Sequence, residues 1–357
     1  MDKVLEKNYK FQDKIGNPFI IKSNGFDSVD ILAQWIKEND KFIKEKISTY
    51  GIILFRDFKI KEASDFEKIA LSIDSDLCDS HPFDDGPRVW LTKYVYEASV
   101  SKIEKAPNPL PFHNEDSYTP YVPSNLMFCS IKPAMKGGES LMVDCRKVLQ
   151  DIPEKTKKKF LNKEVQLQII LDDSTFLVNS RIQKNDSEIY KFAKKYGALK
   201  IKRLGNKTEF LFKVPAIINH NNTPIWFSRA HQASILSYII DIWNTIKYQK
   251  LSFDTFGLIS TIFNCVGKFV KFKVMDMLQG NQNWCRLNDN VNISVLDQIR
   301  INKAFWKNAM ILSLKKGDVL FLDNRIIAHG RMPYKEKRIL LSCMGSLVRV
   351  DKYTGSV

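Results

Sequence analysis

Two histidines and one glutamate, far apart in the chain, are the residues best suited to bind a metal ion. His113 and Glu115 lie two positions apart in the proline-bounded segment Leu110–Glu115, and His329 follows the apolar run Val319–Leu322. In an extended segment, side chains two positions apart point to the same face. Two imidazoles and one carboxylate on one side of an ion leave its other side open, as non-haem Fe(II) requires to take up a chelating co-substrate and oxygen. The sequence therefore predicts a catalytic iron site formed by these three side chains.

A basic residue close to His329 supports this prediction. Taken alone, His113 could be a polar loop residue and His329 a hydrogen-bonded core histidine. Arg338, however, begins the apolar strand Ile339–Met344, and a hairpin between His329 and Arg338 would bring both to the same end of adjacent strands. A guanidinium in that place can bind the remote carboxylate of a dicarboxylic acid whose other end chelates the metal. The alternative is an ordinary solvated arginine in a hairpin.

The segment Gly137–Ser140 offers a second group for the same carboxylate. Its two glycines allow a tight turn or a close approach of the backbone, and the hydroxyl of Ser140 could join Arg338 on the carboxylate. Alternatively, the segment is only a hairpin turn. Three polar residues next to the predicted ligands are expected to contact the substrate, or else to support the ligands structurally: Asn114, Tyr118 and Arg331.

Short strand candidates surround both halves of the predicted site, and helices lie before and between them. Strands are predicted at 51–55, 89–96, 125–131, 140–143, 165–170, 210–212 and 225–227. Helices are predicted at 28–47, from a capping box at Ser64 and Glu67 onward, at 144–160 with a break near Pro153, and at 291–307. The apolar, helix-like stretch from about 232 to 280 is expected to be an insertion or lid. We therefore expect residues 1–357 to form a single domain, mainly β with flanking helices, built on one barrel or sandwich.

The composition allows a sizeable core and argues against several kinds of protein. Hydrophobic residues make up 44% of the 357 residues, but no apolar run approaches the roughly 20 residues of a membrane-spanning helix. The N-terminus has no apolar signal core, so we expect a cytoplasmic protein with no membrane partner. The 6 cysteines are scattered without paired spacing, which favours reduced thiols over disulfides or a zinc site.

The net charge of +15 indicates either an anionic partner or a lysine-rich solvated surface. The runs Lys155–Lys159 and Lys194–Lys195 lie among helix-like residues and lack the interleaved aromatic residues of a surface that stacks nucleic-acid bases. We therefore favour the solvated surface and do not expect nucleic acid as a partner. An acidic carrier protein would be compatible with the charge.

Several segments, in a fixed order, resemble one enzyme family. They are Tyr50–Phe58, Tyr94–Ser99, Phe112–Tyr118, Gly137–Ser140, Trp226–Phe227, Asp323–Asn324, His329–Tyr334 and Arg338. By these motifs the chain, from Tyr50 to Met344, resembles the Fe(II)/2-oxoglutarate-dependent oxygenases of the TauD and clavaminate synthase-like superfamily. Within that superfamily it looks most similar to the SyrP-like amino-acid hydroxylases of non-ribosomal peptide pathways.

The resemblance implies a double-stranded β-helix, a cupin-like jelly roll, with flanking helices. It also implies that His113, Glu115 and His329 bind Fe(II), that Arg338 and Ser140 bind 2-oxoglutarate, and that O2 is the second co-substrate. The family usually has threonine where Ser140 stands, which keeps the hydroxyl. Halogenases of this class lack the carboxylate ligand, so the presence of Glu115 favours hydroxylation or desaturation.

For the substrate, the resemblance implies an amino acid or amino-acid-like small molecule, free or tethered to a carrier protein, hydroxylated at an unactivated C–H bond in secondary metabolism. Two segments depart from the family: Asp116 stands where an apolar residue is common, and Asn281–Arg286 where relatives often carry a Gly-Asp-Gly-like run. The alternatives are an oxygenase for a sulfonate or betaine-type metabolite, a non-catalytic scaffold, and a zinc hydrolase. A zinc hydrolase would not account for Arg338 and Ser140.

Overall fold

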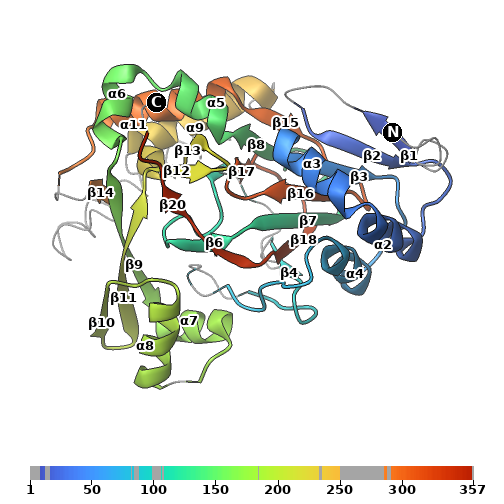
Figure 1. Ribbon diagram of the computed structural model, residues 1–357, viewed down its shortest axis with the longest axis horizontal. Coiled ribbons are helices and arrows are strands. Elements are labelled where there is room, and N and C mark those ends of the chain that lie inside the picture. Colours follow the sequence, from blue (N-terminus) through green and yellow to red (C-terminus); the bar gives the residue numbers. More distant parts are fainter. Residues whose placement is uncertain are drawn as a thin grey trace.

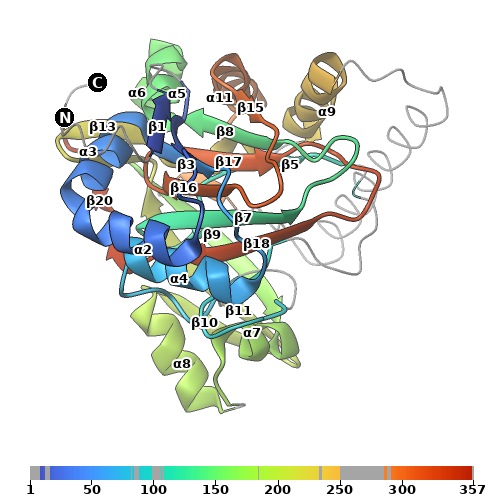
Figure 2. The same ribbon diagram turned by 90° about the vertical axis from the view of Figure 1, so that its right-hand side faces the viewer.

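The computed structural model describes residues 9–12, 17–81, 83, 88–98, 106, 108–183, 185–232, 235–249, 285–287 and 291–355. Its largest sheet has the strand order β1 (Tyr9–Gln12), β2 (Phe19–Ser23), β3 (Ile52–Arg56), β16 (Val319–Asp323), β7 (Asn125–Lys132), β18 (Ile339–Met344), β4 (Tyr96–Glu97). A second sheet has the order β15 (Met310–Leu312), β8 (Ser140–Asp144), β17 (Ile327–Arg331), β5 (Leu110–His113). Figure 2 shows the β8–β17 layer lying over the β7–β18 layer.

Strand β16 shows why the larger sheet can be covered on both faces. Its five residues are all buried, and it pairs antiparallel with β3 and β7. Leu320 and Leu322 belong to the core between the sheets, whereas Val319 and Phe321 belong to the outer core beneath the N-terminal helices. Alternate residues of a strand point to opposite faces, so a continuous apolar run marks a strand with protein on both sides.

Three N-terminal helices cover the outer face of this sheet: α2 (Val29–Glu38), α3 (Asp40–Tyr50) and α4 (Ala63–Ile73). The stretch predicted as one helix is therefore two helices that meet at Asn39, whose backbone leaves the helical region. The capping box of α4 also differs from the prediction, because Glu62 and Asp65 form it instead of Ser64 and Glu67. Both errors concern helix ends, where several polar residues compete for the same free backbone groups.

The second sheet carries helices α5 (Cys145–Asp151), α6 (Glu154–Phe160), α9 (Ile235–Gln249) and α11 (Val295–Lys307), which gather at the top of Figure 1. The predicted break near Pro153 is confirmed, since Ile152 and Pro153 separate α5 from α6. α9 and α11 are joined by the buried carboxylate of Asp241, which accepts hydrogen bonds from Trp306 Nε1 (2.7 Å) and Asn302 Nδ2 (3.1 Å). Of the predicted lid at about 232–280, residues 233, 234 and 250–280 lie outside the described residues.

The remaining elements form smaller sheets. One sheet consists of β9 (Glu164–Asp172), β10 (Lys200–Leu204), β11 (Lys207–Pro215) and β14 (Cys285–Leu287). A second consists of β12 (Ile217–His220), β13 (Thr223–Trp226) and β20 (Asp351–Lys352), and a third of β6 (Tyr121–Pro123) and β19 (Leu347–Arg349). The 3₁₀ turn η1 (Ala230–Gln232) follows β13 in the chain. Two helices that were not predicted lie between the strands expected at 165–170 and 210–212, α7 (Asp173–Ser180) and α8 (Asp186–Lys195). With β10 and β11 they project from the rest of the molecule (Figure 1).

The predicted strand at 89–96 is wrong. Residues 91–94 form bends, and only Tyr96 and Glu97 pair with β18. The expectation of a mainly β protein with flanking helices is confirmed. Across the described parts of the chain, none of the helices combines the length and the apolar character needed to cross a bilayer.

Candidate active site

The strand register of the smaller sheet brings the two predicted histidine ligands together. His329 on β17 pairs with His113 at the end of β5, and their ring centroids are 4.2 Å apart. One donor atom from each of His113, Glu115 and His329 lies within 4.8 Å of the others. Oε2 of Glu115 is 3.5 Å from Nε2 of His329. Three side chains from distant segments thus converge as the sequence predicted.

Glu115 reaches this position from a turn and not from a strand. β5 ends at His113, and residues 115–118 form a turn in which Asp116 has a φ of 55°. The expectation that His113 and Glu115 share one face of an extended segment is therefore wrong. Asn324 clamps the turn, since its Oδ1 accepts from the backbone N–H of Glu115 (2.7 Å) and its Nδ2 donates to the Glu115 carbonyl (3.0 Å). The turn and its clamp thus hold the carboxylate beside the two imidazoles.

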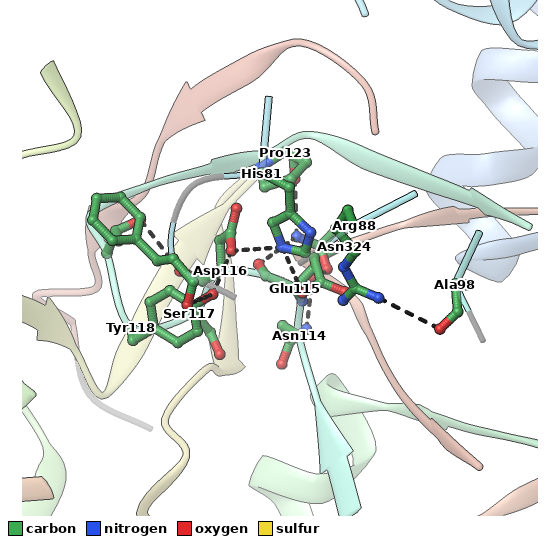
Figure 3. A network of polar contacts seen from close by, with 12 residues as sticks. His81, Arg88, Ala98, Asn114, Glu115, Asp116, Ser117, Tyr118, Pro123 and Asn324 are labelled. Atoms are coloured by element: carbon green, nitrogen blue, oxygen red, sulfur yellow. Dashed lines mark hydrogen bonds and ion pairs between the residues drawn. The ribbon is translucent and has the colours of Figure 1, made fainter. Parts of the chain in front are cut away.

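A third histidine, which the sequence analysis missed, contacts the predicted carboxylate ligand. Nε2 of the buried His81 is 3.2 Å from Glu115 Oε1 and 3.2 Å from Asp116 Oδ1, and Figure 3 shows its ring between the two carboxylates. The Tyr118 hydroxyl donates to the same Asp116 oxygen (2.7 Å). Three of the 5 histidines of the chain, His81, His113 and His329, lie around Glu115, which favours a functional role for this cluster. No spacing in the sequence links His81 to position 115.

The protonation states suit a divalent cation. Burial, with His329 and Arg229 nearby, lowers the pKa of His113 well below its ordinary value. Its Nδ1–H donates to the Pro111 carbonyl (2.9 Å), which leaves the lone pair of Nε2 free. Burial opposes ionisation of Glu115, but hydrogen bonds from His329 and His81 hold its pKa well below the usual range. A neutral imidazole and an ionised carboxylate are what a bound metal requires, so these residues fit Fe(II).

His81 itself is held in its charged form. Burial alone would lower the pKa of this imidazole, but the carboxylates of Asp116 and Glu115 raise it to about 10. The resulting cation lies between two carboxylates of adjacent residues, which would otherwise repel each other. Asp116 has a left-handed backbone, which is uncommon for residues other than glycine, and its side chain and that of Glu115 both contact His81.

A cavity of about 460 Å³ adjoins the three predicted ligands. Ser140 and Arg338, the predicted co-substrate residues, both line it. Arg338 Nη1 donates to the Gly138 carbonyl (2.6 Å), and its guanidinium carbon lies 5.3 Å from the centre of the Tyr334 ring. Burial and the neighbouring Arg331 lower the pKa of Arg338 to about 10. A partly buried guanidinium and a hydroxyl that line one cavity are suited to a carboxylate.

The predicted hairpin between His329 and Arg338 is wrong. β17 pairs with β5 and β8, whereas β18 pairs with β4 and β7 in the other sheet. The two residues reach one cavity because they come from facing sheets. The contact between the rings of Phe128 on β7 and His329, with centroids 5.3 Å apart, is one place where the sheets meet.

The three residues predicted to contact the substrate have different positions. Asn114 is not among the residues that line the cavity; its amide donates to the Asn324 carbonyl (2.7 Å) and thereby supports the turn, which fits the structural alternative given for this residue. Tyr118 and Arg331 both line the cavity. Nη2 of Arg331 donates to the Asn108 carbonyl (3.0 Å), and its buried Nε has no acceptor among the described residues. Sequence reasoning also missed Arg229, which lines the cavity from the segment after β13.

Comparison with known proteins identifies a family. Residues 16–194 match the model of the taurine catabolism dioxygenase TauD, TfdA family. The dapdiamide synthesis protein DdaC of Enterobacter agglomerans is 22% identical over 300 residues, which cover 83% of this chain and 82% of that protein. A clavaminate synthase-like protein of Arabidopsis thaliana is 28% identical over 131 residues, covering 36% of this chain and 38% of that protein.

A solved structure supports the same fold. The crystal structure of PvcB from Pseudomonas aeruginosa superposes with a TM-score of 0.52 at 11% identity, covering 96% of this chain and 94% of that one. PvcB is described as an Fe, alpha-ketoglutarate dependent oxygenase from an isonitrile synthetic pathway. The chain belongs to the TauD/TfdA family and is an iron(II)- and 2-oxoglutarate-dependent dioxygenase, which confirms the expected enzyme class and its cofactors Fe(II), 2-oxoglutarate and O2.

Proposed function

We propose that the enzyme hydroxylates an unactivated C–H bond of an amino acid or amino-acid-like small molecule. In this proposal His113, Glu115 and His329 bind Fe(II), while Arg338 and Ser140 bind the distal carboxylate of 2-oxoglutarate. The observation that carries it is the convergence of the three ligand atoms within 4.8 Å at the wall of a cavity that also contains Arg338. With Fe(II) bound, 2-oxoglutarate and O2 would supply the oxidation. One oxygen atom would enter the alcohol and the other succinate, with release of carbon dioxide.

The protein's own part is to position and to shield. His113, Glu115 and His329 would bind the metal from one side, and the remaining positions would be open to the co-substrate and oxygen. Hydrogen bonds to Pro111 and from His81 fix the orientation of one imidazole and of the carboxylate. Apolar side chains from both sheets, among them Phe128 and Met142, line the cavity and limit the access of water to the reacting atoms.

The relatives support a role in natural-product biosynthesis, since DdaC is named for dapdiamide synthesis and PvcB for an isonitrile pathway. In this proposal the substrate is either free or delivered by an acidic carrier protein. A particular closeness to SyrP-like hydroxylases and a cytoplasmic location are further parts of it. We also propose that the two facing sheets form a double-stranded β-helix and that residues 1–357 are one oxygenase domain, with α9 at the start of a lid.

One observation favours a second candidate, the oxidation of a sulfonate or another small organic anion. Four guanidiniums line the cavity, whereas Glu115 is the one carboxylate among its described lining residues. A zinc hydrolase, in contrast, gains no support, because hydrolysis at zinc has no use for the Arg338 and Ser140 pair.

Anaerobic addition of Fe(II) and 2-oxoglutarate tests the proposed chemistry. The proposal predicts a weak metal-to-ligand charge-transfer band in the visible range, which His113→Ala should abolish. His220→Ala is the matched control, because His220 lies on β12 against Asp323, outside the cavity. A zinc hydrolase or a non-catalytic scaffold predicts no band in the wild-type protein. Succinate release in the presence of candidate substrates, free and carrier-bound, then identifies the substrate.

A further inference from the structure

The cavity contains more positive charge than its cofactors can neutralise. Its described lining includes Arg88, Arg229, Arg331 and Arg338 against the one carboxylate of Glu115. Fe(II), Glu115 and doubly charged 2-oxoglutarate together leave one negative charge, which Arg338 alone balances. Among the residues that the structure describes, neither Arg229 nor Arg331 forms an ion pair with a carboxylate. Charges in a cavity that excludes water are normally paired, so a further anion is expected.

The strand register separates the cavity into two ends. His113, His329 and Met142 form one row across β5, β17 and β8. Two residues further along β17, Arg331 lies opposite Leu110 and Ser140. Arg338 lies at the same end, because its guanidinium and that of Arg331 both lie over the ring of Tyr334 and because it donates to the Gly138 carbonyl. We assign this end to 2-oxoglutarate.

Arg229 belongs to the opposite end. Its Nε donates to Ser117 Oγ (3.0 Å) and its Nη2 to the Asn114 carbonyl (3.3 Å), both in the turn that continues β5 beyond His113. Leu110, which pairs with Arg331, is at the other terminus of β5. The metal ligands thus lie between Arg229 and the 2-oxoglutarate end of the cavity.

The guanidinium of Arg229 is fixed in place but keeps a free donor. It lies 4.7 Å from the centre of the Tyr118 ring, and both of its hydrogen-bond acceptors are neutral. No described residue accepts a hydrogen bond from its Nη1. A guanidinium that stacking and two hydrogen bonds hold in advance binds an anion with little loss of conformational entropy.

We propose that Arg229 binds the acid group of the substrate, a carboxylate or sulfonate, across the iron from 2-oxoglutarate. This inference rests on the proposed function and narrows its substrate to a free organic anion. No described lining residue besides Glu115 offers a carboxylate to an ammonium group, so the cavity selects for net negative charge. A carrier-bound acyl group has lost its carboxylate to the thioester and would not use Arg229.

Four small probes of similar length test this selectivity: butyrate, propane-1-sulfonate, butyramide and n-butylammonium. Each is titrated into the anaerobic complex of the enzyme with Fe(II) and 2-oxoglutarate, and the shift of the charge-transfer band is recorded. The two acids should shift the band with saturation, and the amide and the ammonium should not. The relative affinities of butyrate and propane-1-sulfonate distinguish a carboxylate substrate from a sulfonate substrate.

Replacing Arg229 should weaken the acids selectively. Arg229→Gln should raise the apparent Kd of both acids about tenfold or more, because a charge-assisted hydrogen bond is lost. Arg181→Gln is the matched control, since Arg181 also stacks on an aromatic ring, with 4.0 Å to the centre of Trp90, but does not line the cavity. This control should leave the affinities unchanged. If Arg229→Gln forms no charge-transfer complex, Arg229→Lys takes its place and should bind both acids more weakly than the wild type.

Three results would overturn the inference. They are equal binding of butyramide or n-butylammonium, wild-type affinity for the acids in the variant at position 229, and displacement of 2-oxoglutarate by the acids. Displacement would place the acids at the Arg338 end of the cavity. If the wild-type enzyme forms no charge-transfer complex at all, the proposed function fails instead, so the two failures are distinguishable.

Discussion

Replacement of His81 tests whether a hydrogen bond outside the metal site determines how the site binds iron. His81 Nε2 contacts Oε1 of Glu115 at 3.2 Å, while the other carboxylate oxygen, Oε2, lies 3.5 Å from His329 Nε2. One oxygen is therefore held by His81 and the other is presented to the metal. His81→Phe removes the hydrogen bond but keeps a ring against Tyr96, whose centroid is 5.7 Å away. The carboxylate of Glu115 is then free to rotate or to bind with both oxygens.

The expected loss follows from two independent magnitudes. A hydrogen bond to a charged group contributes about 1.5–3 kcal/mol, and loss of a residue that orients a metal ligand costs about 10- to 100-fold in metal affinity. Because a factor of ten corresponds to about 1.4 kcal/mol, the two ranges agree. His81→Phe should therefore bind Fe(II) about 10- to 100-fold more weakly. His81→Gln, which keeps an N–H donor, should lose less.

Anaerobic Fe(II) titration in the presence of 2-oxoglutarate, followed by the charge-transfer band, measures this affinity. His220→Phe is the matched control, because His220 Nε2 makes a similar contact with Asp323 Oδ2, at 3.3 Å, but touches no metal ligand. Thermal unfolding of the metal-free proteins shows whether the variants remain folded. Wild-type iron affinity in a folded His81→Phe protein would refute the reasoning, as would an equal loss in His220→Phe.

Three other substitutions test the strands, the turn and a buried carboxyl. Gly330→Ala would place a Cβ 2.6 Å from the Leu110 carbonyl oxygen, so it should push β5 from β17, cost about 1–3 kcal/mol in stability, and weaken Fe(II) binding. Asn324→Ala removes the clamp on the Glu115 backbone and leaves polar groups unpaired at about 1–3 kcal/mol each, which thermal unfolding and Fe(II) titration should both detect. Burial raises the pKa of Asp241 from 3.8 to about 7, so the folded protein binds a proton that the unfolded chain has released, and stability should fall as the pH rises through this window. Asp241→Asn should remove this loss of stability, which is about 4 kcal/mol at most. Urea unfolding should therefore show that the variant is more stable than the wild type at pH 8 but not at pH 4. An equal gain at both pH values would contradict the raised pKa of Asp241.

The parts of the site that the sequence predicted are those that strand patterns and residue types determine. The apolar run 319–322 and the segment after it indicated a strand bearing His329, and the ladder places that residue opposite His113. Ser140 was expected at the start of a strand, and it begins β8. For both residues the local sequence pattern predicts the strand, and the chemistry of the side chain then indicates what it can bind.

The parts that the sequence did not predict depend on contacts between distant segments. The contact between His81 and Glu115 depends on how α4, the largest sheet and the turn pack together. The periodicity of the sequence gives no information about such a contact. The register of β17 likewise depends on which strands it pairs with, and a hairpin with β18 was the simplest local choice. Helices α7 and α8 were missed because the flanking apolar residues also fit short strands.

The two kinds of ligand are therefore held by different physical means. The imidazoles of His113 and His329 are fixed by backbone hydrogen bonds between neighbouring strands, so a substitution that separates them, such as Gly330→Ala, acts by displacing a strand. The carboxylate of Glu115 depends on the side chains of Asn324, which holds its backbone, and of His81, which holds its oxygen. Strand pairing within a sheet is determined at many positions at once, whereas a turn held by two side chains can be changed at either of them. Mutations that alter the carboxylate while leaving the fold intact should consequently be found at positions 81 and 324, and those that separate the imidazoles should also disturb the sheet.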